Sequence, residues 1–137
     1  MSIKTAFSMI MIDERYPQKL QHVYIDHFLK KHGYAKSFYG AETELTKNNH
    51  HILIHHLENK IEGDAIVFFC LEQFRDSENK LNLVLMKKIL ESGYDLLIAM
   101  QEICIPSSGN RNFTSIFINE ASVKSRSLID VYKENLN

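Results

Sequence analysis

The chain lacks tryptophan and contains few of the residues that cross-link a fold or interrupt helices and strands. Its 137 residues include two cysteines, two prolines and five glycines. Two cysteines cannot form a disulfide framework, so we expect reduced thiols and a cytoplasmic protein. No apolar run reaches the roughly 18 residues of a membrane span, and no basic segment followed by an apolar core indicates a secretory signal. The sequence therefore predicts no membrane partner.

A strong charge of either sign is also missing. The formal net charge is −1 at pH 7, so no overall field favours nucleic acid, and a nucleic-acid partner is not expected. The chain carries neither a G-x-G-x-x-G fingerprint nor a Walker loop, so the sequence predicts no cofactor. It shows no internal repeat, low-complexity tract or linker. Residues 1–137 are therefore predicted to form a single α/β domain, long enough to bury a core.

Two apolar runs predict buried strands. Residues 65–71 follow a Gly63-Asp64 break, and residues 94–100 follow Gly93. The first run is short, β-branched and aromatic, which is typical of a strand buried on both faces of a parallel sheet. Further strands are predicted at residues 3–7, 35–39 and 113–118.

Segments with helical periodicity separate these strands. Apolar residues recur at helical spacing over residues 15–31, with Pro17 in the first turn and Gly33 just after the last. Further helices are predicted after Asn48 or Asn49, from Asp76-Ser77, and from Asn119. The alternation predicts right-handed crossovers. The expected fold is therefore α/β, a three-layer sandwich around a mostly parallel sheet of four or five strands.

Residues 8–13 are predicted to form an unusually apolar loop. They include Met9, Ile10, Met11 and Ile12. A loop of this kind is expected to be covered, either by the domain itself or by a partner chain. We therefore expect a homodimer in which this loop lies at a two-fold interface.

Polar residues gather where the predicted strands end. Ligands of open α/β sheets bind beyond the carboxyl ends of the strands, so these residues are the candidates for a site. The catalytic candidates are Glu14, Arg15, Glu42 and Gln73, and the substrate-binding candidates are Ser8, Gln18, Glu44, Glu72 and Glu102. Carboxylates that face an arginine can act as acid and base, or can bind the hydroxyl groups of a sugar. The alternative is that these loops are polar only because they are exposed.

Arg15 and Ser8 each allow two interpretations. Arg15 offers a rigid fork of donors that suits an anion or a carboxylate, or it forms a surface ion pair with Asp13 or Glu14. Ser8 as a nucleophile requires a base within hydrogen-bond reach, and no histidine lies at a predicted strand end. Arg15 is therefore the stronger candidate for a ligand contact.

Four histidines cluster on the predicted second helix. His51 and His55 lie four residues apart, a spacing that suits Zn²⁺, and His50 and His56 are adjacent to them. The cluster lacks the glutamate of the zinc-protease pattern and lies on a helix body away from the strand ends. We therefore interpret all four as solvated helix-face residues and predict no metal.

The order of the predicted elements resembles the catalytic domain of serine recombinases over residues 3–105. The family's nucleophile ends its first strand, where this chain has Ser8, and its third strand follows a Gly-Asp pair like Gly63-Asp64. The resemblance implies a resolvase-like fold, or more broadly a flavodoxin-like one. It does not imply recombination, because Leu71-Glu72-Gln73 replaces the family's Leu-Asp-Arg and Ala6 replaces an arginine.

A second resemblance rests on short motifs within residues 5–105. The segments are Ser8, Glu14-Arg15-Tyr16-Pro17-Gln18, Ala41-Glu42-Thr43-Glu44 and Leu71-Glu72-Gln73-Phe74. They resemble the sporadic carbohydrate cluster proteins, a family encoded in bacterial surface-polysaccharide gene clusters. The resemblance implies a role in making or modifying a nucleotide sugar or a glycan, as a small enzyme or a binder of a sugar intermediate. The alternatives are a non-catalytic partner that stabilises or regulates a carbohydrate-biosynthetic enzyme and, with less support, a DNA-acting resolvase relative.

Overall fold

The computed structural model describes residues 3–12, 15–42, 50–75 and 80–107, and the structural statements below refer to these residues. The elements are β1 (Lys4–Met11), α1 (Gln18–His32), β2 (Tyr34–Glu42), α2 (His51–Glu58), β3 (Ala65–Phe68), the 3₁₀ helix η1 (Leu71–Phe74), α3 (Leu83–Glu91), β4 (Asp95–Ile98) and β5 (Ile103–Ile105). Strands and helices alternate as far as β4, which is the pattern of an α/β fold.

The strands form one sheet with the order β2-β1-β3-β4-β5. β1 pairs in parallel with both β2 and β3, β3 pairs in parallel with β4, and β5 runs antiparallel to β4. This is the strand order of flavodoxin-like sheets, apart from the direction of the last strand. The predicted α/β class and mostly parallel sheet are confirmed.

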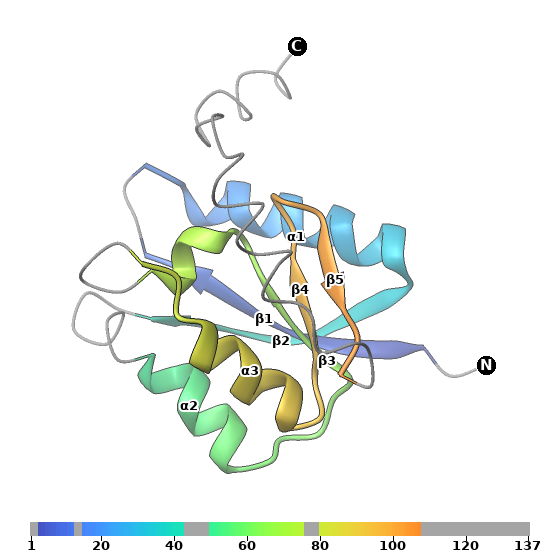
Figure 1. Cartoon of the computed structure of the whole chain (residues 1–137). Helices are drawn as coiled ribbons and strands as arrows, with labels where there is room; N and C mark the ends of the chain where they lie inside the picture. Colours follow the sequence, from blue (N-terminus) through green and yellow to red (C-terminus); the bar gives the residue numbers. More distant parts are fainter. Residues whose placement is uncertain (1–2, 13–14, 43–49, 76–79, 108–137) are drawn as a thin grey trace.

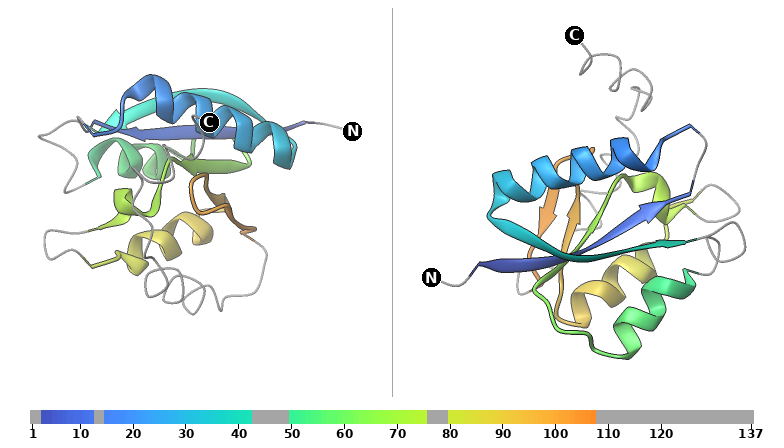
Figure 2. Two further views of the ribbon diagram at one scale, coloured as in Figure 1. Left: turned by 90° about the horizontal axis from the view of Figure 1, so that it is seen from above. Right: turned by 180° about the vertical axis from the view of Figure 1, so that it is seen from behind.

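Helices cover both faces of the sheet (Figures 1 and 2). On one face, Ile25 of α1 shares a hydrophobic core with Ile10 of β1. On the other face, Leu53 of α2 and Ile89 of α3 share a second core with Met9 of β1. Successive side chains of a strand point to opposite faces, so β1 contributes to both cores. The result is three layers, with β1 in the interior.

β1 continues to Met11 rather than ending at Ser8 as predicted. Met9 is 1% exposed and Ile10 is 0% exposed, because β1 lies between two strands and between two layers of helix. The predicted apolar loop over residues 8–13 is therefore wrong, since these side chains fill the protein's own cores. Met9 and Ile10 are thus covered without a partner chain, and they give no reason to expect a homodimer.

The helices begin and end where local chemistry allows. Gly33 ends α1 in the left-handed conformation at a φ of 81°, as predicted. The predicted start of the third helix at Asp76-Ser77 lies outside the described residues, and α3 begins only at Leu83. The Asn82 side chain sets that start, because it accepts a hydrogen bond from Leu85 N at 3.0 Å.

The last described strand is not the one that the sequence predicted. Residues 113–118 and the helix from Asn119 lie outside the described residues. The fifth strand of the sheet is β5, a segment of three residues that pairs with β4. A strand this short has too little periodicity to be recognised in a sequence.

Candidate functional site

The carboxyl ends of β1 and β3 meet where the connections of the sheet change direction. From β1 the chain crosses to β2 through α1 on one face, and from β3 it crosses to β4 through α3 on the other. Open α/β sheets bind their ligands at such a topological switch point. Of the described residues, 12 and 15–17 follow β1 here, and residues 69–74 follow β3. We call Arg15, Tyr16 and Glu72, which these segments contribute, the switch-point site.

A buried glutamine of α1 fixes the segment after β1. Gln21 is 0% exposed. Its Oε1 accepts a hydrogen bond from Met11 N, and its Nε2 donates to Met11 O and Tyr16 O, each at 2.8 Å. One amide thus satisfies backbone groups at both ends of the segment. Arg15 therefore directly precedes a residue whose backbone carbonyl is held by α1.

A second glutamine fixes the segment after β3. Gln73 Oε1 accepts hydrogen bonds from Phe69 N at 2.6 Å and Cys70 N at 3.0 Å, and its Nε2 donates to Met9 O at 2.9 Å. Gln73 was predicted as a catalytic residue. Its side chain instead latches η1 to the backbone of β1, so the amide is occupied by structural bonds.

A third glutamine completes this arrangement from the turn between β4 and β5. Gln101 Oε1 accepts a hydrogen bond from Leu71 N at 3.2 Å. Together with the bonds to Gln73, side-chain carbonyls thus occupy three successive backbone N–H groups after β3. Free N–H groups in such a position form the usual cradle for a phosphate. An anion at this site therefore depends on side chains.

Arg15 and Glu72 join the two segments across the switch point. Arg15 Nη2 lies 3.4 Å from Glu72 Oε2, with 58% of the arginine side chain and 28% of the glutamate side chain exposed. The guanidinium carbon lies 5.0 Å from the centre of the Tyr16 ring, in cation–π contact. Tyr16 is 5% exposed, and its ring packs on that of Phe69 with 5.9 Å between centroids. The structure therefore brings two predicted site residues together beside an anchored aromatic ring.

Ser8 lies in the middle of β1 rather than at its end. It pairs with Tyr39 of β2 and Val67 of β3, and it is 0% exposed. Its Oγ has no hydrogen-bond partner among the described residues. A ligand cannot reach a side chain enclosed in this way, so the prediction of Ser8 as a substrate contact is wrong. The same burial excludes Ser8 as an accessible nucleophile.

The side chain of Glu42 contacts the start of α2, and Gln18 is the first residue of α1. Glu42 ends β2, is 7% exposed, and accepts from Ile52 N with its two carboxylate oxygens at 2.7 and 3.1 Å. It thereby caps the N-terminus of α2, where a negative charge is favourable. Gln18 is the exposed first residue of α1, three positions after Arg15. Glu42 is thus a structural cap, whereas Gln18 stays a candidate contact beside the switch-point site.

Glu102 lies away from the switch-point site. Its carboxylate is 2.8 Å from Lys31 Nζ, and this bond and charge lower the pKa of Glu102. Lys31 is in the last turn of the 15-residue helix α1, whereas Arg15 precedes its first turn. The twist of a sheet turns the ends of distant strands in different directions, so the expected convergence of Glu102 with Arg15 is wrong. Glu14 and Glu44 lie outside the described residues.

The four histidines of the cluster have different environments. His51 and His55 are exposed as predicted, but His50 is 8% exposed and His56 is 3% exposed. The His56 ring stacks on that of Phe7 at 4.1 Å, and its Nδ1 has no hydrogen-bond partner among the described residues. Burial lowers the pKa of both buried histidines, and the charge of His55 lowers that of His56 further. Within the described part of the chain, no group of three or more His, Cys, Asp or Glu could hold a metal ion.

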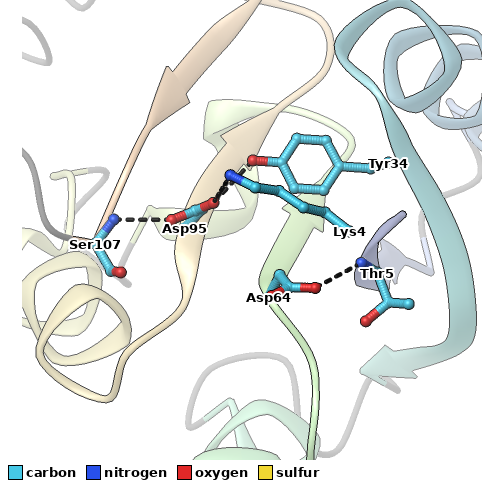
Figure 3. A network of polar contacts seen from close by, with 6 residues as sticks. All are labelled: Lys4, Thr5, Tyr34, Asp64, Asp95 and Ser107. Atoms are coloured by element: carbon cyan, nitrogen blue, oxygen red, sulfur yellow. Dashed lines mark hydrogen bonds and ion pairs between the residues drawn. The ribbon is translucent and has the colours of Figure 1, made fainter. Parts of the chain in front are cut away.

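The amino ends of the strands carry a separate polar network (Figure 3). Asp95, at the start of β4, accepts hydrogen bonds from Tyr34 OH at 2.8 Å and Ser107 N at 2.9 Å, and Lys4 Nζ lies 3.8 Å from its carboxylate. Burial, followed by the bond to Asp95, raises the pKa of Tyr34. The network joins β1, β2 and β4 to the second residue after β5, so we assign it a structural role.

A shallow hollow also lies at the amino edge. Its volume is about 640 Å³, and it opens between the C-terminal ends of α2 and α3 above Tyr94. The Tyr94 hydroxyl is engaged there, since it donates to Ile61 O at 2.6 Å. Ligands of open α/β sheets bind at the opposite edge, so the hollow is a weaker candidate than the switch-point site.

The chain matches no protein-family model, and no curated protein or solved structure matches it at a significant level. No helix in the described ranges combines the length and the apolar character needed to cross a membrane.

Proposed function

We propose that this chain binds a sugar intermediate, such as a nucleotide sugar, at the switch-point site, and that it acts in bacterial surface-polysaccharide biosynthesis. The observation that supports this most is the Arg15–Glu72 pair, which spans the switch point at 3.4 Å. The guanidinium supplies donors for an anionic group, and the carboxylate supplies acceptors for hydroxyl groups. If the chain is an enzyme, these two side chains are the described groups placed to touch the substrate.

The supporting framework favours a prepared site over an accidental surface pair. Gln21, Gln73 and Gln101 hold the backbone on both sides of Arg15 and Glu72. A binding site gains affinity when its backbone is ordered before the ligand arrives, because less entropy is then lost on binding. This is the arrangement expected of a binding site on a rigid scaffold.

A thermal-shift screen against nucleotide sugars and sugar acids tests the proposal. A ligand at 100 times its Kd adds about 2.7 kcal/mol to the free energy of unfolding, which raises the melting temperature by several degrees. We expect a hit with the native chain and a shift reduced to about half or less with Arg15→Ala, because a tenfold weaker affinity leaves at most about 1.4 kcal/mol of stabilisation. Lys88→Ala removes one exposed cation from α3, away from the site, and serves as the control that keeps the shift. A panel without a hit, or a shift that Arg15→Ala leaves unchanged, contradicts the proposal.

The finer fold assignment that we propose is resolvase-like. The strand order β2-β1-β3-β4-β5 and the Gly63-Asp64 pair before β3 support it. A DNA-acting role has little support, because Ser8 is 0% exposed and the net charge is −1. A gel-shift assay at low salt tests this role, and we expect no retarded band.

A second candidate function is that of a non-catalytic partner of a carbohydrate-biosynthetic enzyme. The strand β2 favours it, because β2 is an edge strand of the sheet that the described residues form, and Phe38 is 73% exposed and Tyr39 is 60% exposed. The same surface could also join two copies of this chain in a homodimer. Unpaired strand edges with exposed aromatic side chains readily pair with another chain. Light scattering after size exclusion reports a dimer, and a pull-down from the native host reports an enzyme partner. Phe38→Ser should abolish whichever association β2 mediates.

A further inference from the structure

We propose that Glu72 holds the place of an anionic group of the ligand, and that this group displaces the Glu72 carboxylate from Arg15 when the ligand binds. The ligand is then a sugar that carries a carboxylate or a phosphate. This inference rests on the proposed function, because it concerns the same site. It adds the charge of the ligand and gives Glu72 the role of a competitor.

The geometry of the pair fits a contact that is readily exchanged. The distance from Arg15 Nη2 to Glu72 Oε2 is 3.4 Å, longer than the roughly 2.7–2.9 Å of a well-formed bond between charged groups. Both side chains reach solvent, with 58% and 28% exposed. Exposed ion pairs of this kind contribute little to stability. An anion that meets the guanidinium with two parallel bonds therefore displaces Glu72 at small cost.

Among the described residues of the site, Arg15 is the group that can contact an anion, because the backbone N–H groups after β3 are already engaged. The N–H groups of Phe69, Cys70 and Leu71 donate to the side chains of two glutamines. They therefore do not form the amide cradle on which many α/β proteins hold a phosphate. A carboxylate or a phosphate that enters the site has to approach the same guanidinium that Glu72 contacts.

Arg15 is positioned to stay in place during the exchange. Its guanidinium carbon lies 5.0 Å from the centre of the Tyr16 ring, and that tyrosine is 5% exposed. The backbone carbonyl of Tyr16 is held by Gln21 at 2.8 Å. The Glu72 side chain, in contrast, can rotate away without moving the backbone of η1. The exchange therefore requires no movement of the backbone of η1.

Titration calorimetry with D-glucuronate, D-glucose 1-phosphate and D-glucose tests the inference. The variants are Glu72→Gln and Arg15→Ala. Glu91→Gln is the control, because Glu91 forms a surface ion pair with Lys87 on α3 at 3.8 Å and undergoes the same change of charge. Glu72→Gln should bind an anionic sugar about fivefold more tightly than the native chain, the factor that one surface ion pair of ~1 kcal/mol represents. Arg15→Ala should bind it at least tenfold more weakly, and Glu91→Gln should match the native chain.

The three probes separate the sources of the negative charge. Tighter binding of glucuronate identifies a carboxylate ligand, and tighter binding of glucose 1-phosphate identifies a phosphate ligand. The affinity for neutral glucose should not increase in Glu72→Gln. Should Glu72→Gln not fold, Glu72→Ala removes the same charge and should change the affinity in the same direction.

An unchanged or weaker affinity of the Glu72 variants for the anionic sugars overturns the inference, because Glu72 then positions Arg15 instead of competing for it. The proposed function survives that result as long as the native chain binds and Arg15→Ala binds at least tenfold more weakly. If the native chain binds none of the three probes, the inference fails, whereas the proposed function fails only if the panel of nucleotide sugars and sugar acids also gives no hit.

Discussion

Three glutamine side chains stabilise the backbone at the carboxyl edge of this sheet. A strand that ends leaves backbone N–H and C=O groups without partners, and buried groups of this kind require hydrogen bonds. A primary amide carries two donors and one acceptor oxygen, so a single glutamine can satisfy both kinds of group. Gln21 does so after β1, and Gln73 does so between β1 and η1. The rigidity of the site therefore depends on individual side chains.

Gln73→Ala should destabilise the protein by about 2–3 kcal/mol, because it removes three hydrogen bonds of about 1 kcal/mol each. Urea unfolding followed by circular dichroism measures the change. Gln18→Ala is the matched control at an exposed position of α1, and we expect a change below about 0.5 kcal/mol there. Equal effects of the two substitutions would show that Gln73 is not a latch.

Ser8→Ala should leave the free energy of unfolding unchanged or raise it by up to about 1 kcal/mol. The Ser8 hydroxyl is buried without a hydrogen-bond partner among the described residues, so its removal relieves a desolvation cost. Ser37→Ala is the comparison on the neighbouring strand, where the hydroxyl donates to Ala6 O at 3.2 Å and its loss should destabilise slightly. A large loss of stability in Ser8→Ala would contradict this account of the hydroxyl.

At the scale of elements, α2 depends on contacts from other parts of the chain. It has eight residues, and isolated helices of that length are not stable in water. Glu42 of β2 caps its first turn, and Phe7 of β1 stacks on His56 in its last turn. The helix is therefore held at both ends by the two strands beneath it.

Glu42→Ala should lower the free energy of unfolding by about 1–2 kcal/mol, because it removes a helix cap together with a favourable charge at the helix N-terminus. Glu42→Gln keeps an acceptor oxygen but loses the charge, so we expect a smaller loss. Thermal unfolding of the two variants measures the difference. If Glu42 acted on a ligand instead, both variants would keep the native stability and lose binding.

The buried histidines of α2 should make the protein less stable in mild acid. Burial lowers the pKa of His50 and His56 below the ordinary value of 6.5, so below that pH the unfolded chain binds protons that the folded chain does not. Their contribution is fully present above pH 6.5 and is lost as the pH falls from there through the lowered pKa values.

Urea unfolding between about pH 7.5 and 5.5 measures this slope. His56→Gln should reduce the loss of stability on acidification, although it also lowers the stability at neutral pH. His51→Gln, at an exposed position of the same helix, should keep the native slope. The explanation fails if the two variants respond to pH alike.

At the scale of the whole molecule, the sequence predicted the class of the fold and the edge of the sheet at which the candidate site lies. The alternation of strands and helices indicated a parallel sheet, and the rule for parallel sheets pointed to the strand ends, where Arg15 and Glu72 do meet. The sequence did not predict that the twist of the sheet places Glu102 beside the C-terminal end of α1, far from Arg15. The sequence also could not distinguish a side-chain amide that contacts a ligand from one that hydrogen-bonds to backbone groups. Gln73 is of the second kind, because its Nε2 donates to Met9 O.

Gln21 is the residue of the site region that sequence reasoning missed. A signal was present, because Gln21 occupies a position on the buried side of α1, four residues before Ile25. A polar residue in an apolar stripe has to find buried partners, and here they are the backbone groups at both ends of the loop after β1. The predicted first strand, residues 3–7, is shorter than β1, which extends to Met11. A strand buried on both faces does not alternate in polarity, so its end is hard to recognise in a sequence.

The most direct test of the switch-point site is an amide chemical-shift map of the isotope-labelled protein titrated with a sugar that carries both a nucleotide and a carboxylate, such as UDP-glucuronate. We predict that the largest changes fall on residues 15 and 16 and on residues 69–74, including the side-chain amide of Gln73. Changes confined to Gly63, Gly93 and Tyr94 would place the ligand in the hollow at the amino edge and contradict the account.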